Sequence, residues 1–317
     1  MRFLNQRAVT LCSLLFISLF SIHTAQAVNC NNYQAQVNQA LYWQDLDQLA
    51  QLLRTLKKLP DCSAPYLDWL ERRMSNMASK KAKYWVQRGQ LNRAEKWLKY
   101  KYTPVNLWQT QSVRGDIAAK RKQWSEAAMF YNQALDLIVD PKATPQKPSR
   151  ADIERVYKLA TETQLLAGTL TNVRSSGHSS GAMRNNIAGI EIKERPIPIQ
   201  FVFGKTALTK TGQDTAQKLV TYFQREQPDN IILIGHTDRV GSDAYNCFLS
   251  TKRAKALKNY IVASGIRADM ITTIGKGERA PLELYEPSLY TQNEIDQINR
   301  RVEFAINSAI SYDNACL

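Results

Sequence analysis

The feature that most constrains this chain is a short aliphatic run, Ile231 to Ile234, that leads through a turn into a helix. A continuous apolar run of this length is typical of a strand covered on both faces, and Gly235 ends it. Thr237 and Asp238 follow directly, so they are expected just beyond the end of a buried strand. This strand needs packed elements on both sides, which makes it the centre of a folded domain.

The helical pattern after the turn carries an arginine on its apolar side. Leu249, Arg253, Leu257 and Ile261 recur four residues apart and therefore share one side of a helix. A guanidinium in that position needs an opposite charge, because an unpaired buried charge costs several kcal/mol. Asp238 is the nearest candidate in the sequence, so we expect this acid and this base to converge.

A longer set of motifs surrounds the pair. From residue 235 the chain has Gly-His-Thr-Asp-x-x-Gly-Ser-x-x-Tyr-Asn-x-x-Leu-Ser-x-x-Arg-Ala, and later it has Gly265-Ile266, Gly275-Lys-Gly-Glu278 and Asn299-Arg-Arg-Val-Glu303. Together these motifs resemble the OmpA-like peptidoglycan-binding domain over about residues 196 to 306. The resemblance depends on several separate motifs, so it is much more specific than any one of them.

The resemblance implies a ligand and a set of site residues. In that family, the residues at the positions of Asp238 and Arg253 bind the zwitterionic end of diaminopimelate in the peptidoglycan stem peptide. A carboxylate facing a guanidinium suits an ammonium and a carboxylate on one carbon. Asn246 is expected to project toward the stem peptide as a further donor, with Thr237 and Leu249 lining the pocket. An internal ion pair without a ligand is the alternative for Asp238 and Arg253.

The fold expected for 196–317 is a mixed sheet in the order βαβαββ with helices on one face, as in the OmpA-like family. Pro196 to Phe203 alternates as the first strand, and Lys276 to Ile298 is expected to be a long acidic loop. The chain departs from the family at Gly204-Lys205, where many members have an acidic or amide residue.

Residues 28–170 are helical in pattern and resemble tetratricopeptide repeats. Gly115, Ala118, Ala127, Tyr131 and Ala134 occupy the small and aromatic positions of such a repeat. The whole chain is thus expected to be α+β, with an all-α N-terminal domain. That domain would offer a groove to a protein partner or serve as a structural spacer, and both interpretations stay open.

Between the halves, residues 171–195 are expected to form a linker. Ser175 to Gly181 is polar and rich in small residues, so it buries little apolar area. His178 within it has no acidic or cysteine neighbour and is expected to be solvated. Ile190 to Arg195 alternates like a short strand at the domain boundary.

The N-terminus is predicted to be a signal peptide covering residues 1–27. Arg2 and Arg7 precede an apolar stretch, and Ala25-Gln-Ala27 fits the small-x-small cleavage rule. An uncleaved anchor is the alternative. The mature chain is expected in the periplasm, associated with the cell wall near the outer membrane of a Gram-negative bacterium, with at most peripheral membrane contact.

Export to an oxidising compartment would allow the cysteines to form disulfide bonds. Removal of the signal peptide leaves four, Cys30, Cys62, Cys247 and Cys316, in an oxidising compartment. The pairing that follows domain order is Cys30 with Cys62 and Cys247 with Cys316. Four cysteines allow three pairings, and four free thiols are a further alternative.

The chain is basic, with 42 Lys and Arg against 28 Asp and Glu. The excess lies mainly in the helical half. Nucleic acid is not expected as a partner of an exported protein, whereas cell-wall carboxylates and acidic proteins are.

The sequence gives little support to an enzyme. The mature chain lacks a His-x-x-x-His motif, a nucleophile elbow and a Cys–His pair, so no metal, cofactor or catalytic residue is expected. We therefore expect a non-enzymatic adaptor that binds peptidoglycan and presents its helical domain to an envelope protein. The alternative is a structural component of an envelope machine, such as a flagellar or secretion apparatus, positioned by wall binding.

Overall fold

The computed structural model describes residues 29–170, 180–202, 204–309 and 311–316 of the chain. The expected signal peptide and His178 lie outside the described residues. Among the residues described, none of the helices is both long and apolar enough to cross a membrane.

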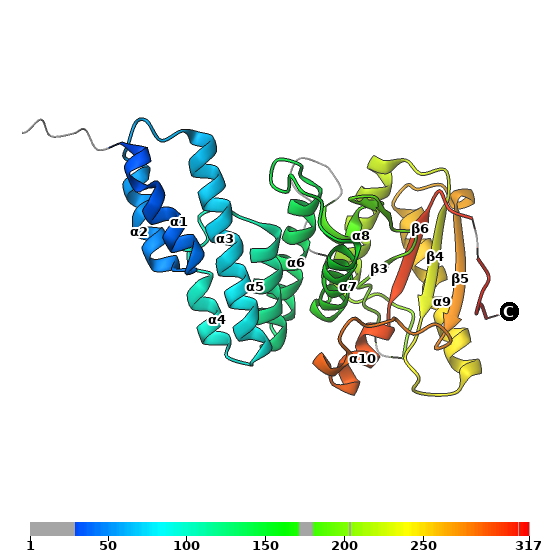
Figure 1. The fold of residues 1–317 in the computed structure, drawn as a ribbon. Coiled ribbons are helices and arrows are strands. Elements are labelled where there is room, and N and C mark those ends of the chain that lie inside the picture. Colours follow the sequence, from blue (N-terminus) through cyan, green and yellow to red (C-terminus); the bar gives the residue numbers. More distant parts are fainter. Residues whose placement is uncertain (1–28, 171–179, 203, 310, 317) are drawn as a thin grey trace, which may run out of the picture.

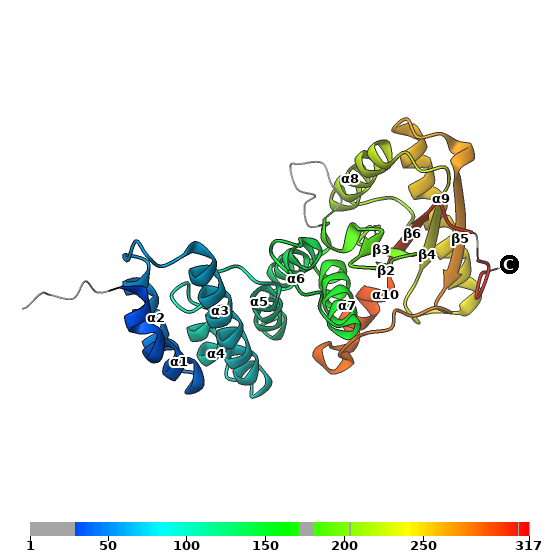
Figure 2. The same ribbon diagram turned by 45° about the horizontal axis from the view of Figure 1, so that its top comes forward.

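The N-terminal half is a succession of helices packed side by side (Figures 1 and 2). After a 3-10 turn, η1 at Cys30–Tyr33, they are α1 Gln34–Tyr42, α2 Leu46–Leu56, α3 Ala64–Gln87, α4 Leu91–Trp97, α5 Trp108–Lys120, α6 Trp124–Val139 and α7 Arg150–Ala167. Each of α5 and α7 packs against α6. The all-α prediction for this half is confirmed.

Local signals in the sequence set the ends of the long helices. The hydroxyls of Ser63 and Ser149 accept hydrogen bonds from the backbone N–H groups of Tyr66 and Asp152, which begins α3 and α7. Gly168 ends α7 in the left-handed region, at φ 72°. These caps satisfy donors and acceptors that each helix end would otherwise expose.

Small residues let α5 and α6 approach closely. A Cβ placed on Gly115 would lie 2.7 Å from the Tyr131 ring on α6. Tyr131 is only 1% exposed, and its hydroxyl donates to the Asp116 carboxylate at 2.7 Å. Ala127 and Ala134 are fully buried beside it. The small and aromatic positions noted in the sequence therefore form one packed interface.

The C-terminal half is built on a mixed sheet of strand order β3-β6-β4-β5. Its elements are β3 Arg195–Ile197, α8 Lys210–Glu226, β4 Ile231–His236, α9 Asp243–Ala263, η3 Ala268–Met270, β5 Ile271–Gly277, η4 Pro287–Leu289, α10 Gln292–Asn299 and β6 Val302–Ile306. β5 runs parallel to β4, whereas β6 is antiparallel to both β3 and β4. The α+β prediction is confirmed.

Helices α8 and α9 cover one face of this sheet (Figure 2). Leu219 and Phe223 of α8, Leu257 of α9, and Ile231 and Phe304 of the sheet are each no more than 1% exposed. The apolar stripes of both helices thus meet the β-branched and aromatic side chains of the strands. This core fixes the position of α9 over the end of β4.

The first strand is shorter than the alternation in the sequence predicts. β3 ends at Ile197, and Phe201 forms only an isolated bridge with Leu208. Pro198 has no N–H to continue a ladder, and the N–H of Ile199 donates to the carbonyl of Ile197. The chain after β3 therefore leaves the sheet, and residues 198–201 line a cavity instead.

Residues 180–195 form the described part of the expected linker, and they contact the helical half. The N–H groups of Gly181 and Ala182 donate to the Asp136 and Asn132 side chains of α6 at 3.0 and 2.8 Å. Two short strands follow, β1 Asn186–Ile187 and β2 Ile190–Glu191, and pair antiparallel. Buried side-chain acceptors on α6 draw this segment inward, which composition alone does not reveal.

The predicted acidic loop at 276–298 contains a helix and contacts the helical half. α10 begins with a capping box between Thr291 and Glu294. Glu162 of α7 accepts hydrogen bonds from the Tyr285 N–H and the Tyr290 hydroxyl, both at 2.7 Å. The two halves of the molecule are therefore in direct contact.

Both predicted disulfides are present. Cys30 and Cys62 tie η1 to the loop before α3, and Cys247 and Cys316 tie the C-terminal tail to α9. The backbone N–H of Cys316 also donates to the Gly275 carbonyl of β5, so the tail lies against the edge of the sheet.

Candidate ligand-binding site

Strand β4 brings Asp238 to the end of the sheet, next to α9. Gly235 permits the close approach, because a Cβ there would lie 2.3 Å from the carbonyl oxygen of Ser250. Arg253 follows Ser250 by almost one turn on the same helix. The buried strand and the helix thus place the predicted acid and base in one region of the molecule.

The Asp238 carboxylate is largely buried and has two partners. Its Oδ1 accepts a hydrogen bond from the Val240 N–H at 3.0 Å, which fixes the turn after β4. Its Oδ2 accepts one from Nη1 of Arg300 at 2.5 Å. The expected direct pair with Arg253 is therefore wrong, because Arg300 takes that position.

Arg253 is a buried guanidinium with little compensation. It is 8% exposed, its Nε donates to the Lys205 carbonyl at 3.3 Å, and its guanidinium lies 5.1 Å from the centre of the Phe201 ring. No carboxylate lies within 4.0 Å of it in the part of the chain that the structure describes. Burial lowers the pKa of Arg253 below its ordinary value, and nearby Arg300 adds to this effect. The site therefore has a strong demand for an anion.

Sheet topology explains why Arg300 reaches Asp238. Arg300 lies between α10 and β6, and β6 pairs with β4 so that Val302 is opposite Gly235. The two residues before β6, Arg300 and Arg301, are thereby placed near the two residues after β4, Thr237 and Asp238. The Asn299-Arg-Arg-Val-Glu303 motif includes Arg300, but the motif alone does not show that Arg300 lies beside Asp238. That proximity follows only from the pairing of β6 with β4, which are distant in the sequence.

A cavity of about 220 Å³ lies beside the ion pair. Arg253 and Arg300 line it together with Gln297 of α10, Leu165 of α7, and the segment 198–201 after β3. Asp238 does not line the cavity itself but is joined to it through Arg300. The cavity lining therefore combines two guanidinium groups with apolar side chains, one of which belongs to the helical half.

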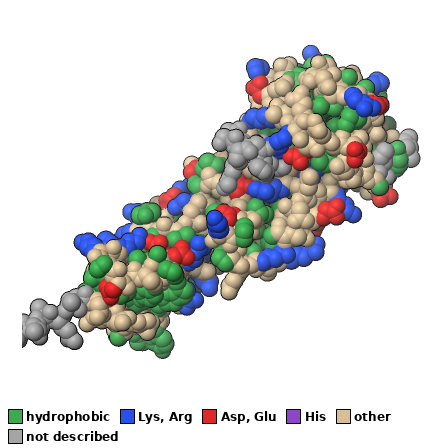
Figure 3. All heavy atoms as spheres, turned by 90° about the horizontal axis from the view of Figure 1, so that it is seen from above, with side chains coloured by type: hydrophobic (Ala, Val, Ile, Leu, Met, Phe, Trp, Pro, Cys, Tyr) green, Lys and Arg blue, Asp and Glu red, His purple; other side chains and the backbone are tan. Residues whose placement is uncertain are grey.

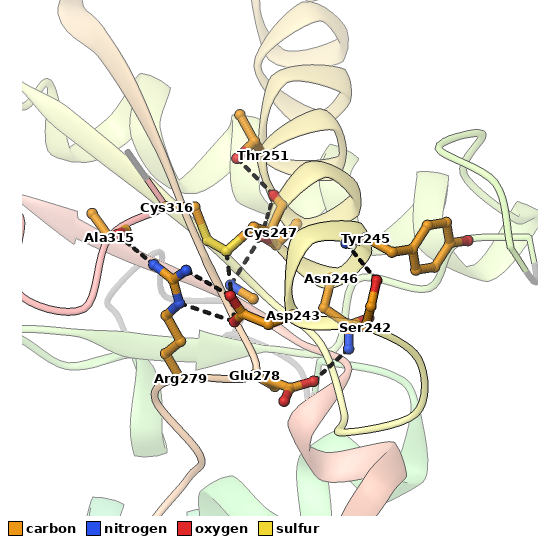
Figure 4. The surroundings of a disulfide bond; sticks show 12 residues. Ser242, Asp243, Tyr245, Asn246, Cys247, Thr251, Glu278, Arg279, Ala315 and Cys316 are labelled. Carbon is orange, nitrogen blue, oxygen red and sulfur yellow. Dashed lines mark hydrogen bonds and ion pairs between the residues drawn. A yellow bond between two sulfur atoms is a disulfide. The ribbon is translucent and has the colours of Figure 1, made fainter.

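Asn246 does not line this cavity, and its expected contact with the stem peptide stays a prediction. It is 1% exposed, and its amide nitrogen donates to Oε2 of Glu278 at 2.6 Å and to the carbonyls of Asp238 and Val240 at 3.3 Å (Figure 4). The side chain fixes the turn that carries Asp238.

Thr237 and Leu249 are also buried, at 4% and 9% exposure, and neither lines the cavity. The Oγ1 of Thr237 has no hydrogen-bond partner among the described atoms. The expectation that both line the pocket is not met in this structure.

A buried charge cluster lies next to the site on the same strands. Nε of Arg301 donates to Glu303 at 2.7 Å, and Nε2 of His236 lies 3.4 Å from the same carboxylate. Burial raises the pKa of Glu303, but the charge of Arg301 and the His236 contact outweigh it, leaving that pKa well below its ordinary value. Burial lowers the pKa of His236. This cluster links β4 and β6 directly behind Asp238 and Arg300.

The Cys247–Cys316 disulfide lies on the other side of the first turns of α9 (Figure 4). Arg279 donates to both carboxylate oxygens of Asp243, at 2.6 and 2.9 Å, and to the Ala315 carbonyl at 3.1 Å. The tail, the helix and the segment after β5 are thus connected at one point. This arrangement fixes the N-terminal end of α9. Arg253 lies further along the same helix.

The described residues contain no group of three or more His, Cys, Asp and Glu side chains that could bind a metal ion. The chemistry that the site offers is charge-assisted hydrogen bonding from a carboxylate, a buried guanidinium and a half-exposed guanidinium. Such a set is chemically complementary to a small carboxylate-bearing or zwitterionic group.

The C-terminal domain thus has helices on one face of a mixed sheet and a cavity beside the strand ends that is lined by two arginines. Residues 200–290 match the OmpA family. The chain therefore carries an OmpA-family domain in its C-terminal half, as its motifs predicted.

Relatives match about a quarter to a third of the chain. Outer membrane protein A of Shimwellia blattae is 40% identical over 86 residues, which are 26% of this chain and 36% of that protein. Outer membrane protein P5 of Haemophilus influenzae is 33% identical over 121 residues, 34% of this chain and 32% of that protein. This chain thus covers about a third of the length of these relatives.

Solved structures show partial likeness. The peptidoglycan-associated lipoprotein from Burkholderia pseudomallei is 23% identical with a TM-score of 0.29, covering 36% of this chain and 89% of that one. A putative MotB-like protein from Desulfovibrio vulgaris is 28% identical with a TM-score of 0.29, covering 36% and 72%.

Proposed function

We propose that this protein is a non-enzymatic adaptor of the bacterial envelope that binds peptidoglycan through its C-terminal domain. The observation that carries the proposal is Arg253, a buried guanidinium that lines a cavity without a carboxylate partner among the described residues. A buried charge of this kind is costly unless an anion meets it. A ligand carboxylate in the cavity would supply that anion.

The ligand we propose is the diaminopimelate head group of the stem peptide, which carries an ammonium and a carboxylate on one carbon. The carboxylate would bind Arg253 by charge-assisted hydrogen bonds, and the ammonium would bind the Asp238 carboxylate. Because Arg300 pairs with Asp238 in the structure, the ammonium must displace or share that contact. Arg300 would then turn toward the ligand carboxylate.

The envelope location is supported by the family match and by relatives that are named outer membrane proteins. We place the protein in the periplasm, with a signal peptide at 1–27, a helical domain at 28–170 and a wall-binding domain at 196–317. The helical domain would be presented to a protein partner.

Sedimentation with purified sacculi tests the proposal. We expect Arg253→Ala and Asp238→Ala each to reduce co-sedimentation by about tenfold or more, since each removes a hydrogen bond to a charged group. Arg267→Ala is the matched control, because the Arg267 side chain is 74% exposed and its ion-pair partner, Asp269, is also exposed. Circular dichroism confirms that each variant is folded.

Two results would overturn the proposal. One is unchanged sedimentation of a folded Arg253→Ala protein. The other is release of soluble muropeptides from sacculi by the wild-type protein, which would show an enzyme instead of a binder.

A further inference from the structure

The C-terminal domain places an acidic segment, residues 283–294, against the helical half. Glu283 lies 3.0 Å from Nζ of Lys158, Glu286 lies 3.6 Å from Nζ of Lys120, and Glu294 lies 2.8 Å from Nζ of Lys122. All three lysines belong to the helical half, which has an excess of basic residues, and Figure 3 shows Lys and Arg side chains along that part of the molecule. The contact is therefore electrostatically complementary along its length.

The helical half also contacts the backbone and the rings of this segment. Nζ of Lys122 donates to the Leu289 carbonyl at 2.6 Å, and the guanidinium of Arg155 lies 5.6 Å from the Tyr285 ring centre. Glu162 accepts from the Tyr285 N–H and the Tyr290 hydroxyl. These contacts select a segment with tyrosines at defined positions, and charge alone would not require them.

The acidic segment leaves part of this surface unfilled. A cavity of about 340 Å³ remains between it and the helices α3, α5 and α7. We call this cavity, together with the helical surface that the acidic segment covers, the helical groove. Lys83 and Val86 of α3 line the cavity opposite Glu286 and Leu289. Lys83 is exposed and has no carboxylate within 4.0 Å among the residues described. The groove thus contains volume that the acidic segment does not fill and a lysine with which that segment does not pair.

We propose that the helical groove binds an acidic, tyrosine-containing segment of a partner protein, and that the acidic segment occupies the groove until such a partner displaces it. This deepens the proposed function by naming the surface and the partner chemistry, and it rests on that function only for the idea that the helical half receives a protein.

The acidic segment and a partner segment would be stabilised in the groove by different contributions. The acidic segment is tethered, so it competes at a high effective concentration without an association cost. A partner lacks this advantage, but it can fill the remaining cavity and pair with Lys83, which adds buried area and a charge contact. Displacement is therefore a balance between tethering and a more complete fit.

A labelled peptide with the sequence of residues 281–294 is the probe, added in trans to the full chain. We expect it to bind a chain carrying Tyr285→Ala and Glu286→Gln about tenfold more tightly than the wild type, because these changes weaken the tethered competitor. Adding Lys120→Glu to that chain is expected to reduce peptide affinity by about tenfold, because it reverses a charge in the groove.

Two controls separate the groove from general charge effects. Lys58→Glu makes the same charge change at an exposed position just after α2 and is expected to leave peptide affinity unchanged. The same peptide with glutamine in place of glutamate is expected to bind at least about tenfold more weakly. Equal binding to the opened and wild-type chains, or no effect of Lys120→Glu, would overturn the proposal.

Hydrogen exchange on the wild-type chain tests the same idea without a variant. Excess peptide is expected to speed exchange of the Tyr285 amide, which donates to Glu162 only while the acidic segment is docked. Unchanged exchange at saturating peptide would also overturn the proposal. None of these measurements uses sacculi, so failure of wall binding and failure of the groove remain distinguishable.

Discussion

Arg300 donates from Nη1 to Oδ2 of Asp238 at 2.5 Å, so the acid of the candidate site is already paired by an arginine that is itself 41% exposed. Arg253, by contrast, is buried and lacks such a partner among the described residues. Arg253 is therefore expected to stabilise a bound ligand carboxylate more strongly than Arg300, although both line the same cavity.

This difference predicts an order of effects. Arg253→Gln is expected to weaken sacculus binding by about tenfold or more, since a buried charged hydrogen bond is worth about 1.5–3 kcal/mol. Arg300→Gln is expected to weaken it by less than about fivefold, because solvent screens an exposed pair. Sedimentation at a series of sacculus concentrations measures both. Equal losses for the two variants would contradict the assignment of Arg253 as the principal anion ligand.

Glu162 predicts a pH dependence of stability. It is 1% exposed at the contact between the two halves, and burial raises its pKa to about 7 from 4.5, although Tyr290 and the Tyr285 N–H oppose the shift. A raised carboxyl pKa means that the folded state binds the proton more tightly, so stability is lost as the pH rises from about 4.5 through 7. The loss is roughly 3 kcal/mol at full ionisation.

Urea unfolding of wild type and Glu162→Gln at pH 5 to 8 checks this. The free energy of unfolding of the wild type should fall relative to the variant as the pH rises, because glutamine does not titrate. Lys158 and Glu286 also face Glu162 and are present in both proteins, so they cancel in the comparison. Parallel pH curves would show that Glu162 titrates normally.

The disulfide between Cys247 and Cys316 predicts a large stability change. It closes a loop of 69 residues, for which chain-entropy estimates give about 4 kcal/mol. Replacing both cysteines with serine is expected to lower the free energy of unfolding by roughly 2–4 kcal/mol. Neither cysteine lines the cavity beside Arg253, so sacculus binding at low temperature should persist. Loss of binding with unchanged stability would contradict this separation.

The packing around Gly115 predicts whether its replacement by alanine raises or lowers the stability of the helical half. Alanine is favoured over glycine in a helix by about 1 kcal/mol, but a Cβ here would lie 2.7 Å from the Tyr131 ring. Overpacking of this kind costs about 1–3 kcal/mol, so Gly115→Ala is expected to destabilise the helical half. Thermal unfolding measures the change, with exposed Ser125→Ala on α6 as the control. A more stable Gly115→Ala protein would mean that α5 can move away from α6.

The sequence predicted the elements that depend on local pattern. The strand at Ile231–His236, the helix that carries Arg253 and the all-α half follow from periodicity and turn residues, which act over a few neighbours. The Cys247–Cys316 pairing followed from domain order. Each of these needs no knowledge of how distant segments meet.

The remaining features depend on distant segments. Arg300 reaches Asp238 only because β6 pairs with β4, and Asn246 turns inward only because Glu278 accepts from it. Residues 180–183 are buried because Asn132 and Asp136 of α6 accept hydrogen bonds from the N–H groups of Ala182 and Gly181. The exception is α10, which the sequence does indicate through the capping box of Thr291 and Glu294, although a loop was expected there.

Helix α7 contacts β3 and α10 as well as α6, and Leu165 near its end lines the same cavity as Arg253. The carbonyl of Leu166 accepts a hydrogen bond from Gln297 at 3.1 Å. A force applied to the helical half would therefore be transmitted along α7 to the candidate site through direct contacts among the described residues. Under the proposed function, the length of the helical half would set the distance between the cell wall and the protein partner.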